Sequence, residues 1–252
     1  MIRIVIAIWG LILLVGCSKE RDDSVFQVSI IDALLAGNYQ GYYKCEELLE
    51  HGDFGLGTFN ELDGEMLILD GEIYQVKGDG SIDRPSKKTM TPFGVIKYFS
   101  SDSMLQVEGV GLEEFENFLD QCFPDQSKFY AIQVNGYFSR IKTRSLFAQK
   151  PPYKPLIDIP MNKFTTSETE GTLIGFRCPV FVKGLNVPGY HFHFLSKDHL
   201  FGGHVLDFYL KKGTIRIDES REFKLLLPDD EGELSAMDNS KDRTEELNKV
   251  ER

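Results

Sequence analysis

Histidines gather in one short stretch of the C-terminal half of this chain. Four of its five histidines lie within fourteen residues, namely His191, His193, His199 and His204. Successive side chains of a β-strand point to opposite faces, so His191 and His193 would present two imidazoles on one face of a strand. This spacing alone is a weak signal, because unrelated strand histidines also show it. We treat His199, next to Asp198 in an expected loop, as the spare member of the cluster.

His204 can supply a third nitrogen ligand. It follows Gly202-Gly203, and paired glycines allow a tight return and close backbone approach that would bring His204 beside the other two imidazoles. Three histidines with an open coordination position are the pattern of catalytic rather than structural zinc. Imidazoles by themselves do not select zinc over copper, nickel or iron. The pattern therefore predicts a metal site and leaves the metal open.

Charged residues on two expected strands are further candidates. Glu65 begins an apolar strand and shares a face with Leu67, which makes it either a solvated residue at the sheet edge or an acid in a pocket. Arg140, Lys142 and Arg144 alternate along another strand and share one face. Such bases either protect a solvated edge strand or bind an anionic substrate. An anion would need a local basic group, because the chain as a whole is acidic.

The composition is that of a globular protein with an acidic surface. The chain has 252 residues, 42% hydrophobic and 27% charged, which excludes a collagen-like, coiled-coil or wholly disordered protein. Acids outnumber bases 39 to 28, a net charge of -11, so nucleic acid is not an expected partner. Three cysteines without metal-type or disulfide-framework spacing are predicted to be small buried residues: Cys45, Cys122 and Cys178.

The N-terminus is predicted to be a lipoprotein signal. Residues 4–15 carry no charge, but twelve residues are too few to span a bilayer, and they have the length of a secretory apolar region. The following Leu14-Val15-Gly16-Cys17 resembles a bacterial lipobox. We therefore expect a signal peptide at 1–16, a lipid on Cys17 and a tether at 17–24, which makes the protein exported and membrane-bound only through that anchor. A plain export signal or an uncleaved anchor is the alternative.

Turn signals and periodicity predict an α+β fold. Asp70-Gly71 between two apolar runs indicates a hairpin, and apolar residues at helical spacing indicate a helix over 112–123. Strands are expected over 129–134 and 137–145, joined at Asn135-Gly136, and later over 172–176, 180–182, 190–195, 204–210, 214–217 and 223–227. The prolines at 151, 152, 155 and 160 suggest a boundary between domains at 25–155 and 156–228. The acidic segment 229–252 is expected to be a solvated tail or an exposed helix.

Taken together, the motifs resemble the alpha-acetolactate decarboxylase family. The resemblance extends over about residues 25–227. It is carried, in order, by Gly55-Leu56-Gly57-Thr58-Phe59-Asn60, Leu62-Asp63-Gly64-Glu65, Thr91-Pro92-Phe93, Asn135-Gly136-Tyr137-Phe138, Arg144-Ser145, Pro151-Pro152-Tyr153-Lys154-Pro155-Leu156, Gly171-Thr172-Leu173-Ile174-Gly175-Phe176, Val187-Pro188-Gly189-Tyr190-His191-Phe192-His193-Phe194 and Gly202-Gly203-His204-Val205-Leu206-Asp207-Phe208. The His-x-His-Phe and Gly-Gly-His blocks are the specific ones.

The resemblance implies a zinc enzyme that converts 2-acetolactate to acetoin and carbon dioxide. It implies His191, His193 and His204 as metal ligands, Glu65 and Arg144 as the active-site acid and arginine, Thr58 near the metal, and a glutamate returning from the C-terminus. Glu251 fits that glutamate by position, and Glu245 or Glu246 are alternatives. The implied fold has two α/β domains on mixed and antiparallel sheets, with the metal site in the C-terminal domain, and the implied assembly is a homodimer. The lipobox departs from the soluble members of the family.

Three functions compete at this point. The first is decarboxylation of a 2-hydroxy-3-keto acid through a metal-stabilised enediolate, with Arg144 orienting the carboxylate and Glu65 delivering a proton. The second is a non-catalytic exported lipoprotein that binds a metal or ligand on the same fold. The third is metal-dependent hydrolysis, since zinc held by histidines also activates water. The presence of Glu65 and Arg144 together with the three histidines favours the first.

Overall fold

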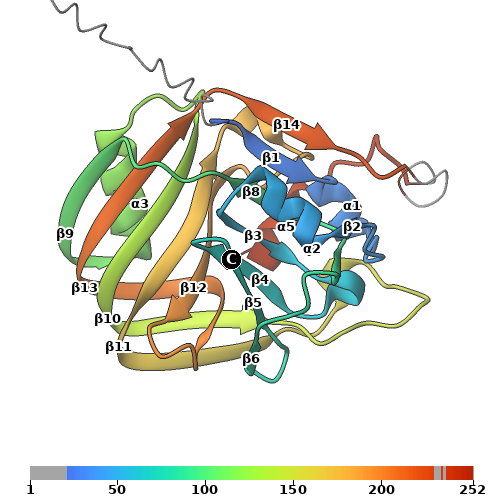
Figure 1. Ribbon diagram of the computed structural model, residues 1–252, viewed down its shortest axis with the longest axis horizontal. Coiled ribbons are helices and arrows are strands. Elements are labelled where there is room, and N and C mark those ends of the chain that lie inside the picture. Colours follow the sequence, from blue (N-terminus) through green and yellow to red (C-terminus); the bar gives the residue numbers. More distant parts are fainter. Residues whose placement is uncertain (1–21, 230–233, 235–236, 252) are drawn as a thin grey trace, which may run out of the picture.

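The computed structural model describes residues 22–229, 234 and 237–251 of the chain. It is an α+β protein with two large β-sheets and a small two-stranded sheet (Figure 1). Within the described residues, no helix combines the length and the apolar character needed to cross a bilayer. The expected signal peptide and Cys17 lie outside the described residues, so their prediction stands as it was made.

The first sheet has seven strands in the order β14-β1-β8-β3-β4-β5-β6. Its strands are β1 (Val25–Val28), β3 (Phe54–Thr58), β4 (Glu65–Leu69), β5 (Glu72–Val76), β6 (Ile82–Asp83), β8 (Gly94–Lys97) and β14 (Phe223–Leu226). The sheet is mixed because β1 pairs with β14 in parallel and the other pairs are antiparallel. Asp70 and Gly71 join β4 to β5 with φ of 52° and 76°, the left-handed conformation that a tight hairpin turn requires.

Short elements surround the first sheet. The strands β2 (Tyr43–Lys44) and β7 (Met90–Thr91) pair with each other, and the helices α1 (Ile31–Ala36) and α2 (Cys45–Leu48) lie between the early strands in the chain. Single 3-10 turns occur at η1 (Leu49–His51), η2 (Asn60–Leu62), η3 (Leu156–Asp158) and η4 (Val180–Val182). The expected strand over 180–182 is therefore wrong. Pro179 precedes it, and the N–H of Val182 donates to the Pro179 carbonyl at 3.2 Å and closes a turn instead.

The second sheet contains the expected histidine strands. It has the order β10-β11-β12-β13-β9, with β9 (Ser103–Gly111), β10 (Phe129–Ser145), β11 (Asn162–Cys178), β12 (Gly189–Ser196) and β13 (Gly202–Ser220), all antiparallel. Because β10 also pairs with β13, the four strands β10, β11, β12 and β13 form a closed ring. The predicted helix is α3 (Leu112–Cys122), whose Phe115 and Leu119 pack on the apolar side chains of this sheet.

Two expected turns are absent from this sheet. The segments 129–134 and 137–145 form the single strand β10, and the segments 204–210 and 214–217 both belong to β13. Asn135 and Gly136 are paired on both sides, with β11 and with β13, so the backbone stays extended. Glycine is needed at 136 for space, since a Cβ there would lie 2.9 Å from the carbonyl oxygen of Lys212 in the neighbouring strand.

The proline-rich segment does not separate the two sheets. It connects β10 to β11, which are neighbours in the second sheet, and β9 and β10 precede it. Conversely, β14 follows it and pairs with β1 in the first sheet. The expected boundary at 155 is therefore not where the sheets divide. The reason is that β10 finds both of its partners, β11 and β13, beyond the prolines.

The two sheets share one core, and the candidate site lies beside it. Leu56 and Leu67 of the first sheet belong to the same buried cluster as Ile174 and Leu195 of the second sheet. The C-terminal helix α5 (Thr244–Glu251) adds to this cluster through its buried residues Leu247 and Val250. Of the three cysteines, Cys45 and Cys178 are buried and free as expected, whereas Cys122 is exposed because it ends α3 on the solvent side.

Candidate metal centre

Three histidines meet on the face of the second sheet that is turned toward β4 of the first sheet. His191 and His193 point to one side of β12, while Phe192 and Phe194 pack in the core on the other side. His193 lies opposite His204 of β13 in the register of the two strands. All three imidazoles are buried, and ligand atoms of the three lie within 4.8 Å of one another. The geometry expected from the spacing of these residues is therefore present.

The chemistry of this cluster fits a cation. Nδ1 of His193 is 2.8 Å from the Met66 carbonyl, so this nitrogen donates and leaves the Nε2 lone pair for another partner. Within the described residues, His193 Nε2, His191 Nδ1 and Glu251 Oε2 are buried without a hydrogen-bond partner. Buried polar atoms rarely remain unpaired. A cation among them would provide the missing interaction.

Burial keeps the imidazoles uncharged. It lowers the pKa of His191 to about 3, and the nearby Arg144 guanidinium acts in the same direction. Burial likewise holds the pKa of His193 and of His204 well below the ordinary value, with the other imidazoles and Arg144 contributing. Neutral imidazole is the form that binds a metal. The cluster is therefore ready to coordinate an ion at neutral pH without first losing a proton.

Glu65 lies beside the histidines at the start of β4. One of its oxygens accepts a hydrogen bond from Arg144 at 2.6 Å, and the other is 3.6 Å from His193 Nε2. Burial raises the pKa of Glu65 to about 7, and the Arg144 charge opposes that rise only in part. Of the two sequence alternatives for Glu65, the pocket acid is the correct one. Such a carboxyl can exchange a proton near neutral pH.

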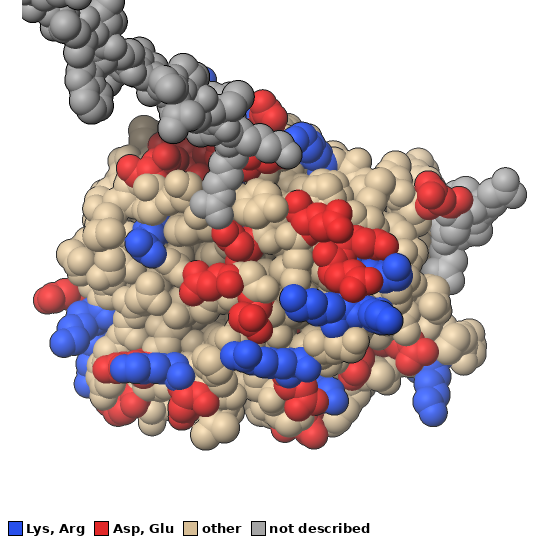
Figure 2. All heavy atoms as spheres, viewed as in Figure 1, with Lys and Arg blue, Asp and Glu red and all other residues tan. Residues whose placement is uncertain are grey.

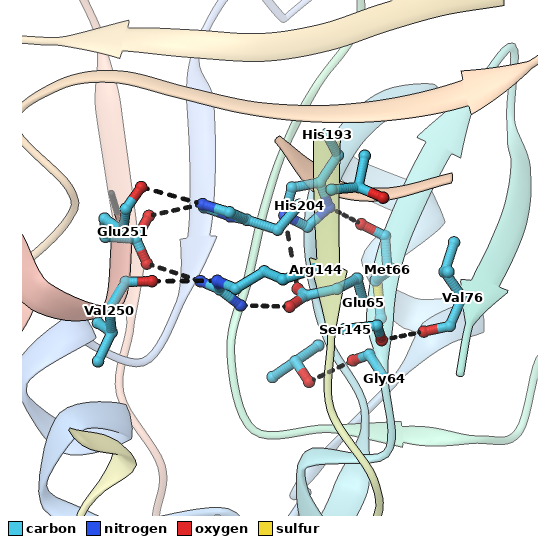
Figure 3. A network of polar contacts seen from close by, with 12 residues as sticks. Gly64, Glu65, Met66, Val76, Arg144, Ser145, His193, His204, Val250 and Glu251 are labelled. Atoms are coloured by element: carbon cyan, nitrogen blue, oxygen red, sulfur yellow. Dashed lines mark hydrogen bonds and ion pairs between the residues drawn. The ribbon is translucent and has the colours of Figure 1, made fainter. Parts of the chain in front are cut away.

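Arg144 connects the acid to the C-terminal helix (Figure 3). It lies opposite His204 in the register of β10 and β13, and its Nε donates to the Val250 carbonyl at 3.0 Å. One guanidinium nitrogen donates to Glu65, and another is 3.4 Å from Glu251. Arg140, by contrast, is exposed and pairs with Asp207 at 2.8 Å. Among the three alternating bases, Arg144 alone contacts the site.

The C-terminal helix places Glu251 at the centre. Its carboxylate is 3.6 Å from His191 Nε2 and 3.8 Å from His204 Nε2, and burial raises its pKa. The alternatives do not reach the site, since Glu245 is exposed and Glu246 pairs with Lys241. The acidic end of the chain is therefore more than a solvated tail. The signal for this was the pair of apolar residues at helical spacing, Leu247 and Val250.

Thr58 has a positioning role in this geometry. It ends β3 directly opposite Glu65, and its buried hydroxyl donates to the Gly64 carbonyl at 2.7 Å. This bond fixes the residue immediately before Glu65. Gly64 itself has φ of 86°, and a Cβ there would lie 2.3 Å from the Val76 carbonyl oxygen, so the turn that aims Glu65 requires glycine.

Two cavities meet at the histidines. An inner chamber of about 30 Å³ is lined by Thr58, Glu65, Arg144 and the histidine cluster, and an outer cavity of about 500 Å³ opens beyond it. His191, His204 and Glu251 line both cavities. The outer walls carry further acids that the sequence did not single out, namely Glu113, Glu116 and Asp207. The inner chamber is too small for a nine-atom keto acid, so such a substrate would approach from the outer cavity.

Comparisons with known proteins bear on the family and the fold of this chain. The family model for alpha-acetolactate decarboxylase matches residues 25–238. A relative of that name from Methanosarcina mazei is 43% identical over 238 residues, which covers 93% of this chain and 82% of the relative, and one from Bacillus licheniformis is 37% identical, with 82% and 83% covered. The crystal structure of alpha-acetolactate decarboxylase from Bacillus subtilis strain 168 superposes with a TM-score of 0.88 at 32% identity, covering 90% of this chain and 99% of that one.

Proposed function

The chain belongs to the alpha-acetolactate decarboxylase family, whose members are carbon–carbon lyases, and from this premise we propose that it decarboxylates 2-acetolactate to acetoin with zinc as its cofactor. The observation that carries the proposal is the site itself. Three neutral imidazoles converge with a carboxyl of raised pKa and a buried arginine. A site for simple metal storage would not need the last two groups, and membership of the decarboxylase family favours decarboxylation over hydrolysis.

Zinc fits the donor set. His191, His193 and His204 would hold it, and the Glu251 carboxylate lies beside two of these imidazoles. When bound, the ion would supply a Lewis acid that stabilises negative charge on the oxygens of the substrate. The protein side chains supply binding, orientation and a proton.

Arg144 is the group that would orient the substrate carboxylate. It is the buried cation of the inner chamber, and its planar guanidinium suits paired hydrogen bonds to a carboxylate. Its existing bond to the Val250 carbonyl holds it in place while substrate enters. Binding of the carboxylate should not be too tight, because that charge leaves as carbon dioxide in the transition state.

Glu65 is the group that would deliver the proton. Loss of carbon dioxide leaves an electron pair that the neighbouring ketone accepts, which gives an enediolate, and protonation of one face gives one enantiomer of acetoin. In the metal-free fold, burial raises the pKa of Glu65 to about 7, which favours a carboxyl that can hold and release a proton near neutral pH. Its position on β4 fixes the face from which the proton would come.

We also propose that the mature protein is exported and anchored through a lipid on Cys17, and that it forms a homodimer. The motif Leu14-Val15-Gly16-Cys17 supports the first part, and the resemblance to the family supports the second. The acidic and basic side chains interspersed over the face in Figure 2 give no basic surface for a nucleic acid there.

The test is a comparison of substrates with the purified mature chain loaded with zinc. We expect a single enantiomer of acetoin from freshly prepared 2-acetolactate, measured by chiral gas chromatography. A sample without enzyme is the control, because this substrate also decays by itself. Simple carboxylic esters should remain intact. Ester hydrolysis without acetoin would favour the hydrolase, and bound zinc without either product would favour the non-catalytic lipoprotein.

A further inference from the structure

Exposed apolar side chains gather on one side of the molecule. Eight large hydrophobic residues are exposed among those that the structure describes, and four of them lie on or beside η4 and β14. They are Val180, Phe181, Leu185 and Leu227, with exposed fractions of 76%, 67%, 36% and 46%. We call these four residues the β14-side patch. The first three belong to one loop, closed by the Leu185 N–H on the Val182 carbonyl at 2.8 Å.

This patch lies beside the point where the chain enters the fold. The Phe181 ring is 6.4 Å from that of Phe129, which stacks at 5.1 Å on Phe223 of β14. Phe223 is the register partner of Val25, the first residue of β1. Figure 1 shows β1 and β14 together at one edge of the molecule. The patch and the beginning of the fold therefore share that edge.

The residues just before β1 are fixed to the same edge. Asp22 pairs with Lys224 of β14 at 2.6 Å, and Asp23 pairs with the buried Lys97 at 2.9 Å. Cys17 precedes Asp22 by five residues, which span at most about 18 Å when fully extended. A domain of this size is roughly 45 Å across. A lipid on Cys17 would therefore bring the β1–β14 edge to the bilayer and keep the opposite side away from it.

We propose that the β14-side patch contacts the surface of the membrane to which the protein is anchored. The proposal rests on lipidation of Cys17. Phe181 and Val180 would enter the interface between head groups and acyl chains, as apolar residues of peripheral proteins do. Lys183 and Lys224, exposed to 54% and 48%, flank the patch, and each pairs with an aspartate, Asp242 at 2.8 Å and Asp22 at 2.6 Å, so the rim carries paired charges of both signs. The bilayer would thus hold the enzyme in one orientation.

A single introduced tryptophan can report on this contact by its fluorescence. Trp9 is the one tryptophan of the chain and lies in the segment that signal cleavage would remove, so the mature protein would have none. We would introduce Phe181→Trp into the lipidated protein and reconstitute it in vesicles that contain bromine-labelled phosphatidylglycerol and phosphatidylethanolamine. The control is Tyr209→Trp, which places tryptophan at another exposed aromatic position. Tyr209 precedes Ser220, the last residue of β13, by eleven residues, which is about 35 Å along the strand.

We expect bromine to lower the fluorescence of Phe181→Trp about twofold and to leave the fluorescence of Tyr209→Trp unchanged. The reason is that only a tryptophan at the membrane interface contacts the labelled acyl chains. Equal fluorescence of Phe181→Trp with and without bromine would overturn the proposal. Sedimentation of the lipid-free chain adds a second check. A dimer that Phe181→Asp dissociates would assign the patch to a second copy and also overturn the proposal.

The anchor and the patch can fail separately. The intact mass of the protein, purified from a bacterial envelope, shows whether Cys17 carries a lipid. An unmodified or uncleaved chain would overturn the lipid anchor and, with it, the contact of the patch with the membrane in the cell. Coupling Cys17 to a maleimide lipid in a Cys122→Ser background, which removes the exposed cysteine, tests the patch on its own. Quenching of Phe181→Trp in that preparation would support the patch even where the cell does not add the lipid.

Discussion

At the residue scale, burial sets the protonation state of the site more than direct pairing does. Glu65 accepts a hydrogen bond from Arg144 at 2.6 Å, yet its pKa is raised to about 7 because desolvation outweighs the neighbouring positive charge. The same burial lowers the pKa of the three histidines. One environment thus produces neutral imidazoles and a carboxyl of raised pKa within a few ångströms of each other.

The first prediction separates these two roles. His193→Ala removes a ligand, so bound zinc and acetoin formation should fall together. Glu65→Gln keeps the shape and the Arg144 contact but carries no exchangeable acidic proton, so zinc should remain and kcat should fall by about 10²–10⁴-fold. Metal analysis by mass spectrometry beside steady-state rates measures both. A His193→Ala variant with full zinc and full activity would disprove the ligand assignment.

The second prediction concerns the pH dependence of stability without metal. The pKa of His191 is about 3 in the fold and 6.5 when free, so between these values the unfolded chain binds a proton that the fold does not. The free energy of unfolding should therefore fall with falling pH, by about 1.4 kcal/mol per pH unit from this residue.

Urea unfolding of the metal-free protein at pH 6.5 and 5.0 measures this fall. Wild type should lose about 2 kcal/mol more than His191→Gln over this interval. Glu65 acts in the opposite direction, because its pKa is raised, but it is present in both proteins and cancels in the comparison. Equal losses in the two proteins would show that His191 is not buried in neutral form.

At the element scale, the site depends on a short helix at the end of the chain. Helix α5 has eight residues and is held by Leu247 and Val250 in the shared core, and it presents Glu251 to the histidines. An isolated helix of this length is not stable in water. Its structure, and therefore the position of Glu251, depends on packing against the body of the protein.

The third prediction follows from that dependence. Leu247→Ala removes about 2–4 kcal/mol of packing and should undock α5, which lowers kcat/KM and zinc affinity at least about tenfold. The free energy of unfolding should fall by no more than this amount, since the sheets keep the rest of the shared core. Asn248→Ala on the exposed side of the same helix is the matched control and should behave as wild type. Loss of activity in both variants would point to a general disturbance instead.

At the scale of the whole molecule, a buried ion pair connects the two sheets. Lys97 of β8 is fully buried and lies 2.5 Å from Asp218 of β13, whose other oxygen accepts the Ser100 N–H at 2.6 Å. Burial raises the pKa of Asp218, which Lys97 opposes. The pair joins the two sheets close to the start of β1, where Asp23 also pairs with Lys97 at 2.9 Å.

The fourth prediction tests this connection. Lys97→Ala leaves the Asp218 carboxylate buried without its cation and should lower the free energy of unfolding by about 3–5 kcal/mol. The control is Lys211→Ala, which breaks an exposed pair with Glu168 and should cost at most about 1 kcal/mol. Denaturant unfolding gives both values, and equal effects would refute a structural role for the buried pair.

Features set by interactions between residues close in the sequence were predicted, and features set by distant residues were not. The two histidines of β12 and the hairpin at Asp70-Gly71 follow from local periodicity and turn chemistry, and both were predicted correctly. The pairing of β1 with β14 was not, because it joins residues about two hundred positions apart and no local pattern encodes it. The outer cavity was missed for the same reason, since α3, β12 and β13 each contribute one wall.

The residues of the site divide in the same way. The convergence of the three histidines could be expected from strand alternation and from the glycines before His204. The burial of Glu65 beside them could not, because alternation left it either at a solvated sheet edge or in a pocket. The choice of Glu251 over Glu245 and Glu246 could not, since it depends on how deeply α5 packs. Nor does sequence decide which of the alternating bases is buried. The strand pairs of β10 and the bond from Arg144 to the Val250 carbonyl decide it.

The most direct test of the proposed function is a zinc titration of the metal-free mature chain, with acetoin formation from fresh 2-acetolactate as the readout. Because one three-histidine site serves each chain, the rate should start at the level of the sample without enzyme. It should then rise linearly and stop rising at one zinc per chain, and a chelator should return it to the starting level. Full acetoin formation by the metal-free protein, or none from folded protein with one zinc bound, would contradict the proposed function.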